Sequence, residues 1–284
     1  MKKFTVIAIA LLMPLLALAQ AQIDTKKVKI SDFTQKITKV VLTGNQFYDT
    51  CLQGEVSTKW HVSPYEFCSM SEFDKIKSDD SYYFLLTTKG QFKKETEPGL
   101  TFLTLVKGGK ESEKGIGEML EIVAFPYASA EDPSGREISF LASILDIIQN
   151  YALDSMEKDI NAYTGLPNYT MNITKSGKMK LVFAEGDLSA EITPEVKNQL
   201  FDENVLVIDA DDADEYLTKN NENTLVSYVV VPSSGKVGSY CYKMLLEPRA
   251  NKLYYFRKHK ISKKAGPGFL LEDVKRITAP RLSK

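Results

Sequence analysis

The sequence predicts an α/β fold, on the border with α+β, made of two tandem copies of a β-α-β-α-β-β-β-α unit with mixed sheets. Short apolar runs without alternation predict strands that are covered by helices on both faces. The same order of elements starts near residue 39 and again near residue 179, a spacing of about 140 residues. A single larger α/β domain is the alternative, because βα units are common.

The first unit is expected to span residues 39–156. Its third strand is followed by two alternating segments, which indicate antiparallel neighbours. Ser71 is the expected cap of its second helix. The closing helix is apolar on more than one side, so we expect it to touch both units. The expected elements are strand 40–43, helix 46–59, strand 64–68, a helix after residue 71, strands 82–87, 101–106 and 118–125, and helix 137–156.

The second unit is expected to span residues 179–284. Pro194 suits a first helical turn, and Asp211 or Asp212 is the expected cap of the following helix. The expected elements are strand 179–183, helix 194–200, strand 205–208, a helix ending near residue 219, strands 225–231, 239–246 and 252–261, and helix 269–277. Residues 157–178 are the expected linker, and residues 22–38 are a polar lead-in with a short strand at Val28 and Ile30 or a mobile segment.

The first 21 residues have the pattern of a secretory signal peptide. Lys2 and Lys3 precede an apolar run, and small residues at 17, 19 and 21 suit cleavage. No cysteine stands at the cleavage point, and no later run is long enough to span a membrane. We therefore expect an exported, soluble protein, periplasmic or secreted, that is not a lipoprotein. Removal of two lysines changes the formal charge from −1 to −3, which favours no nucleic-acid partner.

The order helix, strand, helix, strand and antiparallel hairpin resembles the modules of TolB amino-terminal domains and of CsgG-like proteins of curli secretion. The whole chain also resembles secreted proteins of Gram-negative envelopes, most of all in the segment KWHVSPYEFCSMSEFDKIK. The resemblance lies in element order, so it implies an α/β fold and an envelope location rather than an activity.

Motifs of common chemistries do not occur in the sequence. Only His61 and His259 are present, no G-x-S-x-G elbow exists, and the three cysteines do not have zinc spacing. Cys51 and Cys68 are a possible disulfide pair, although three buried thiols are the simpler interpretation. Gly115 and Gly235 fit hairpin turns better than phosphate loops. We expect no catalytic residue, no metal and no cofactor; a hydrolase without a recognisable motif is the remaining enzymatic alternative.

Charge is divided unevenly over the second unit. Residues 185–223 hold twelve acids and two lysines, and residues 249–284 hold eleven Lys or Arg and two acids. The clustered acids suit either a calcium-binding loop or the start of a helix. Counted from Asp209, positions six and twelve hold Asp214 and Asn220, where a calcium loop needs Gly and Glu. The candidate acidic surface comprises Asp209, Asp211, Asp212, Asp214 and Glu215. The candidate surface for an anionic partner comprises Arg257, Lys258, Lys260, Lys263 and Lys264.

These observations favour a non-catalytic, exported binding or assembly module of the cell envelope. Its expected partner is a protein or an anionic envelope component that contacts the basic surface. The basic residues also suit a solvated edge strand that discourages aggregation, or a contact with the acidic stretch of the same chain. The second functional hypothesis is small-ligand binding in a cleft between the two repeats.

Overall fold

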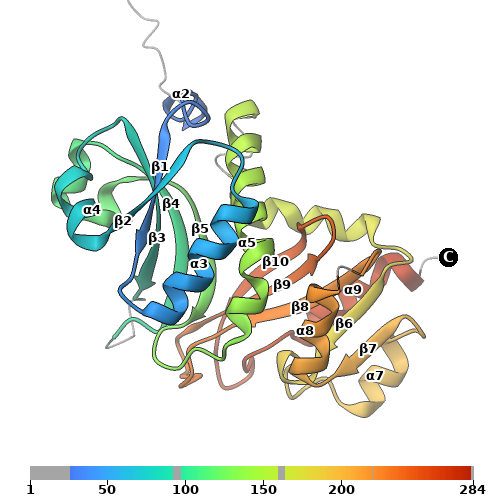
Figure 1. Ribbon diagram of the computed structural model, residues 1–284. Coiled ribbons are helices and arrows are strands. Elements are labelled where there is room, and N and C mark those ends of the chain that lie inside the picture. The colour runs from blue at the N-terminus through green and yellow to red at the C-terminus, as the bar shows by residue number, and fades with distance from the viewer. Residues whose placement is uncertain (1–25, 92–96, 159–163, 220, 283–284) are drawn as a thin grey trace, which may run out of the picture.

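The computed structural model describes residues 26–91, 97–158, 164–219 and 221–282, so the expected signal peptide lies outside the described residues. The first half forms a five-stranded sheet in the order β2-β1-β3-β4-β5 (Figure 1). β1 runs parallel to β2 and β3, whereas β4 is antiparallel to both β3 and β5. Its strands are β1 Ile37–Leu42, β2 Tyr65–Ser69, β3 Tyr82–Gly90, β4 Leu100–Lys107 and β5 Leu120–Ser129.

The second half repeats this sheet with the same order and the same strand directions. Its order is β7-β6-β8-β9-β10, with β6 parallel to β7 and β8, and β9 antiparallel to β8 and β10. The strands are β6 Lys180–Ala184, β7 Val205–Ile208, β8 Thr224–Val230, β9 Tyr240–Glu247 and β10 Lys252–Lys260. Two sheets with one topology confirm the predicted tandem α/β units.

Helices connect the parallel strands and close each unit, as predicted. The α-helices of the described residues are α2 Lys26–Lys29, α3 Gln46–Lys59, α4 Met70–Ile76, α5 Arg136–Glu157, α7 Pro194–Leu200, α8 Ala210–Thr218 and α9 Leu271–Leu282. The short 3-10 segments are η1 Lys110–Lys114, η2 Ile116–Glu118, η3 Leu166–Lys175 and η4 Glu185–Asp187. Among the residues described, no helix combines the length and the apolar character that a membrane crossing requires.

Two helix starts differ from the sequence prediction for the same reason. Ser69, rather than Ser71, caps α4 through a hydrogen bond from the Glu72 amide. Asp209, rather than Asp211 or Asp212, caps α8. In both cases the strand runs into the helix with no loop between them, so the last extended residue serves as the cap.

The lead-in also differs from the expected strand, because residues 26–29 form α2. Ile30 and Phe33 follow the helix and are fully buried, and this spacing of three places both side chains on one side of the turn. Phe33 contacts the edges of Trp60 and Tyr83. The lead-in therefore covers the core of the first unit.

Helix α5 lies in the seam between the two sheets (Figure 1). It contacts α3 and β5 of the first unit, and α8 and β10 of the second. Phe140 stacks on Tyr228 of β8 with ring centroids 4.1 Å apart, and Ser143 donates a hydrogen bond to Asn251. One continuous cluster of buried apolar residues extends from the first sheet through α5 to the second. The expectation that this helix touches both units is confirmed.

Candidate functional site

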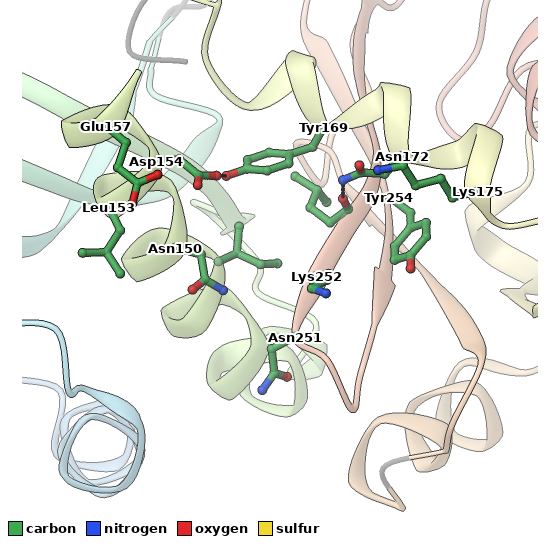
Figure 2. Close-up of a pocket in the computed structure, with 12 residues that line it drawn as sticks. Asn150, Leu153, Asp154, Glu157, Tyr169, Asn172, Lys175, Asn251, Lys252 and Tyr254 are labelled. Carbon is green, nitrogen blue, oxygen red and sulfur yellow. Dashed lines mark hydrogen bonds between the residues drawn. The ribbon is translucent and has the colours of Figure 1, made fainter. Parts of the chain in front are cut away.

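A cleft of about 460 Å³ opens between the last turns of α5, η3 and the start of β10 (Figure 2). One wall belongs to the first unit and consists of the exposed side of α5, where Asn150, Asp154 and Glu157 follow one another at helical spacing. The opposite wall carries Lys175 and Lys252. The cleft thus has carboxylates on one side and ammonium groups on the other.

The aromatic and amide side chains of the cleft are held by hydrogen bonds. Tyr169 donates its hydroxyl to Asp154 Oδ2 at 2.7 Å, so the two walls are joined at one end. Burial, together with the Asp154 carboxylate, raises the pKa of Tyr169 well above its ordinary value, which keeps the hydroxyl a donor. Burial also raises the pKa of Tyr254 to about 12.

Segment η3 lies along the outer edge of β10 and forms part of the cleft wall. Thr170 both donates to the Phe256 carbonyl and accepts from the Phe256 amide, and Asn172 donates to the Leu253 carbonyl at 2.9 Å. These side chains satisfy backbone groups that an edge strand would otherwise leave unpaired. The expected linker is therefore fastened to the second sheet where it borders the cleft.

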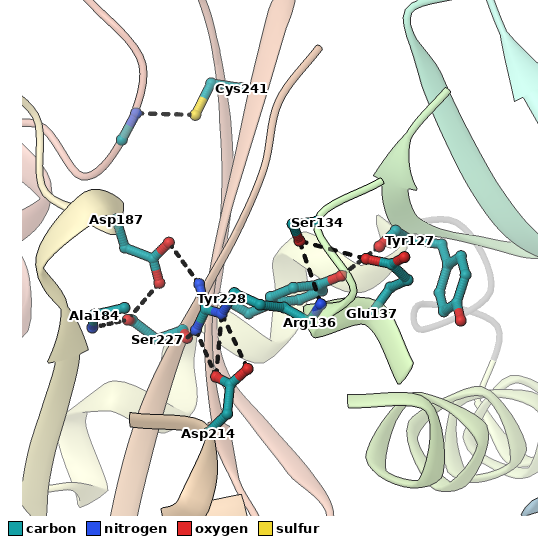
Figure 3. A network of polar contacts seen from close by, with 11 residues as sticks. Tyr127, Ser134, Arg136, Glu137, Ala184, Asp187, Asp214, Ser227, Tyr228 and Cys241 are labelled. Carbon is teal, nitrogen blue, oxygen red and sulfur yellow. Dashed lines mark hydrogen bonds and ion pairs between the residues drawn. The ribbon is translucent and has the colours of Figure 1, made fainter. Parts of the chain in front are cut away.

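The seam is also fastened by a buried ion network around Arg136, the first residue of α5 (Figure 3). Its guanidinium donates to Asp214 from Nη2 at 2.8 Å and to Asp187 from Nη1 at 3.0 Å. It also donates to the Ser227 carbonyl at 3.2 Å and lies over the rings of Phe140 and Tyr228. One side chain of the first unit therefore neutralises two carboxylates of the second.

The pKa directions in this network agree with its geometry. Burial raises the pKa of Asp187, and the Arg136 guanidinium partly reverses this rise. Burial likewise raises the pKa of Asp214. Burial alone would lower the pKa of Arg136, but the two carboxylates raise it. The Ser227 hydroxyl donates a hydrogen bond to the other oxygen of Asp187, Oδ2, at 2.5 Å. The network joins the two units and places no reactive group at the surface.

The structure divides the candidate acidic surface. Asp209 caps α8, Asp211 and Asp212 lie exposed in its first turn, and Glu215 forms an exposed ion pair with Lys219. Asp214 is buried and faces Arg136, so it does not belong to a surface. Ala213 and Leu217 are buried on the same side of α8, and this apolar spacing is the feature of the sequence that indicates the inward position.

The candidate basic residues lie along the end of β10 and the loop after it. Arg257 is turned toward Glu272 and Asp273 at 3.5 Å. Lys258 and Lys260 are exposed and lie over the ring of Tyr240. Lys263 and Lys264 are exposed. Elsewhere in the basic stretch, Arg281 donates to Asp202 and Arg249 pairs with Glu222, so part of the basic stretch contacts the acidic stretch of the same chain.

The three cysteines are free thiols, and Cys51 and Cys68 form no disulfide. Burial raises the pKa of Cys68 and of Cys241 to about 11. His259 Nε2 donates to the Gly266 carbonyl at 2.8 Å, and burial lowers the pKa of His259. Within residues 26–91, 97–158, 164–219 and 221–282, no group of three or more His, Cys, Asp or Glu side chains is placed to hold a metal ion.

Comparison with protein-family models, with curated proteins and with solved structures gives no match for this chain. The candidate site therefore rests on the geometry above. Sequence patterns predicted the helix that forms one wall and the turn between β9 and β10. The contact of η3 with β10, and the packing of that turn against α5, became visible only in the folded chain.

Proposed function

We propose that the protein is a non-catalytic binding module, exported as the sequence predicts, whose ligand occupies the cleft between the two repeats. The observation that supports this proposal is the separation of charge across the cleft. Asp154 and Glu157 lie on the α5 wall, and Lys175 and Lys252 lie on the wall of the second unit. A small ligand that carries an amine and a carboxylate, such as an amino acid or a short peptide, complements both walls.

The polar groups between the charged walls suit such a ligand. Asn150 and Asn172 provide amide groups, and the Tyr254 ring, half-buried, provides an apolar surface. Ile147 and Leu253 are buried and form apolar parts of the lining. An apolar floor with a few polar groups at the walls is the usual composition of a small-molecule site. The hydrogen bonds that fix Tyr169 and Asn172 keep the site formed before a ligand enters, which lowers the entropic cost of binding.

Calorimetric titration of the mature chain tests this proposal. Free amino acids and dipeptides are compared with the same compounds after acetylation of the amine or amidation of the carboxylate. We expect Glu157→Gln to weaken binding of the free ligands about fivefold to tenfold, and Lys252→Gln to weaken it similarly, since each removes one charged partner at a partly solvated site. Glu113→Gln and Lys110→Gln, both exposed in η1, are the matched controls.

The blocked ligands show which wall binds which group. Acetylated ligands should be insensitive to Glu157→Gln, and amidated ligands insensitive to Lys252→Gln. Equal binding of free and blocked ligands, or no binding of any of them at millimolar concentration, would show that the cleft does not recognise a dipolar ligand.

A second candidate function is contact with a protein or an anionic envelope component through the basic surface. The specific observation is that Lys258 and Lys260 are exposed yet held over Tyr240, so their ammonium groups project from a fixed strand. A pull-down of the mature chain from envelope extract tests it. Charge reversal of Lys258, Lys260, Lys263 and Lys264 to Glu should abolish capture; unaltered capture would exclude the basic surface.

A further inference from the structure

A second cavity, of about 390 Å³, lies in the first unit at the carboxyl ends of β1 and β3. It is bordered by the loop between β1 and α3, by the end of β5 and by the start of α5. From β1 the chain crosses to β2 on one side, whereas β3 pairs with β1 on the other side. Because β2 and β3 lie on opposite sides of β1, the connections that leave the neighbouring strands run in opposite directions. This leaves a crevice at the carboxyl ends of the parallel strands, where α/β proteins commonly bind ligands.

The corresponding crevice of the second unit is filled by its own chain. The segment before α9 crosses the loop after β6, where the Phe269 amide donates to the Asp187 carbonyl at 2.8 Å. The Phe269 carbonyl accepts from the Ser189 amide at 3.1 Å. Gly268 lies so close that an added Cβ would stand 2.7 Å from the Asp187 oxygen. In the first unit, the segment before α5 leaves the cavity open instead.

Tyr127 of β5 lines the cavity and carries a buried hydroxyl. The residue is only 3% exposed, and its Oη makes no hydrogen bond of normal geometry among the described residues. Burial, and after it the nearby Tyr48 hydroxyl, raises the pKa of Tyr127. The neighbouring Tyr48 shares a hydrogen bond with Thr87 at 3.1 Å, and its ring meets the Tyr127 ring edge-on at 5.7 Å. A buried polar atom without a hydrogen bond lowers the free energy of unfolding. A hydrogen bond from a bound ligand would remove this cost.

The charge at the cavity is negative. Glu137, which lines it, is 7% exposed, and its Oε2 accepts from the Gly135 amide at 3.0 Å. The Ser134 hydroxyl also donates to Glu137 Oε2, at 3.4 Å (Figure 3). The lining residues that the structure describes include no lysine, arginine or histidine. The amides of Thr43 and Gly44, which an anion at this helix start would need, already donate to Asp49 at 2.8 Å. Phosphate or carboxylate ligands are therefore disfavoured.

We propose that this cavity binds a small organic cation, an ammonium group on a compact hydroxyl-bearing body. The Glu137 carboxylate supplies the countercharge. The rings of Tyr48, Tyr127 and Phe47 supply faces for cation–π contact, and Phe47 is 71% exposed at the rim. The Tyr127 hydroxyl supplies a hydrogen-bond partner for the ligand hydroxyl. This site is separate from the cleft between the repeats.

Titration with choline and with its neutral carbon isostere, dimethylbutanol, tests the proposal, because the two molecules differ in charge at nearly equal shape. Choline should bind the mature chain, and the isostere should bind at least about tenfold more weakly. Glu137→Gln keeps the size of the side chain and an acceptor for the helix start, and should reduce the affinity for choline about tenfold or more. Glu113→Gln, exposed in η1 and outside both cavities, is the matched control and should leave the affinity unchanged.

Tyr127→Phe separates a binding role from a structural one. The substitution removes a buried hydroxyl whose neighbouring hydroxyl, that of Tyr48, already shares a hydrogen bond with Thr87. The free energy of unfolding should therefore change little, whereas choline affinity should fall severalfold. Equal affinity for choline and its isostere, unchanged affinity in Glu137→Gln, or no binding of choline at millimolar concentration would each overturn the proposal. Because dipolar ligands and Glu157→Gln report on the other cleft, either proposal can fail without the other.

Discussion

Replacement of Arg136 by methionine should weaken the joint between the two repeats more than any surface substitution. Methionine keeps the apolar stem that packs on Phe140 and Tyr228, but it removes the guanidinium that Asp187 and Asp214 share. The two carboxylates are 4% and 8% exposed, so solvent cannot replace the lost partner. The substitution therefore leaves two uncompensated charges in the seam.

The expected loss in the free energy of unfolding is about 3–5 kcal/mol, the usual cost of removing one partner of a buried ion pair. For a chain of this size, such a loss lowers the melting temperature by roughly 10 °C. Changing all three residues, to Arg136→Met, Asp187→Asn and Asp214→Asn, should restore most of the stability, because no buried charge then remains. Lys219→Met, which breaks only the exposed pair with Glu215, should leave the free energy of unfolding nearly unchanged, because solvent screens that pair.

The pH dependence gives an independent test with a definite sign. Burial already raises the pKa of Asp187 and of Asp214, and loss of Arg136 raises both further. A carboxyl group whose pKa is raised in the folded state favours folding below its unfolded pKa of about 4, and this contribution is lost as the pH rises through the folded pKa. The deficit of Arg136→Met relative to wild type should therefore be small near pH 4 and largest near pH 7.

Urea unfolding followed by two probes provides the measurement. Trp60, the single tryptophan, is buried in the first unit and reports on that unit by fluorescence, while circular dichroism reports on both. In Arg136→Met the two transitions should separate, with the second unit less stable. Coincident transitions with a midpoint equal to that of Lys219→Met, or a deficit that does not change between pH 4 and 7, would refute the assigned role of the network.

Two further predictions concern backbone and thiols. Gly268 and Gly135 both have φ near +90° before the closing helix of their unit, but only Gly268 has backbone atoms within 3 Å of an added Cβ. Alanine at 268 should therefore lower the free energy of unfolding by several kcal/mol, against about 1 kcal/mol at 135, measured by urea unfolding. Cys51, half-buried, should react with a thiol reagent in the native chain, whereas Cys68 and Cys241 should react only on unfolding, because they are buried and their pKa is raised to about 11.

The fold class could be predicted from the sequence, because strands and helices are indicated by patterns of residues that are close together in the chain. Apolar runs such as 40–43 and 179–183, and the repeated spacing of about 140 residues, indicate the strands and their order along the chain without knowledge of tertiary contacts. Helix starts were predicted less well. Ser69 and Asp209 act as caps because strand and helix meet without a loop, and the sequence does not show where pairing with the neighbouring strand ends.

The candidate sites were less accessible, because they depend on contacts between segments that are far apart in the chain. The wall formed by Asp154 and Glu157 follows from helical periodicity, but the facing lysines come from η3 and from the β9–β10 turn. The inward position of Asp214 could have been predicted from the sequence, because Asp214 lies on the same face of α8 as the apolar residues Ala213 and Leu217. Its partner Arg136 is 78 residues away, and no local pattern indicates that pairing.

The duplication explains why both cavities border the same helix. Two copies of the unit create two crevices at strand ends and one seam between the sheets. The segment before α9 fills the crevice of the second unit, so the crevice of the first unit and the seam remain. Gly135, Glu137 and Ile138 at the start of α5 line the crevice. At the other end of the helix the cleft in the seam is lined by Ile147, Asn150, Leu153, Asp154 and Glu157. The buried network at Arg136 and the hydrogen bond from Tyr169 to Asp154 fix the helix at both ends. Because one fixed helix forms a wall of each cavity, both cavities are already formed, so a ligand of the proposed kind would spend little of its binding free energy on ordering them.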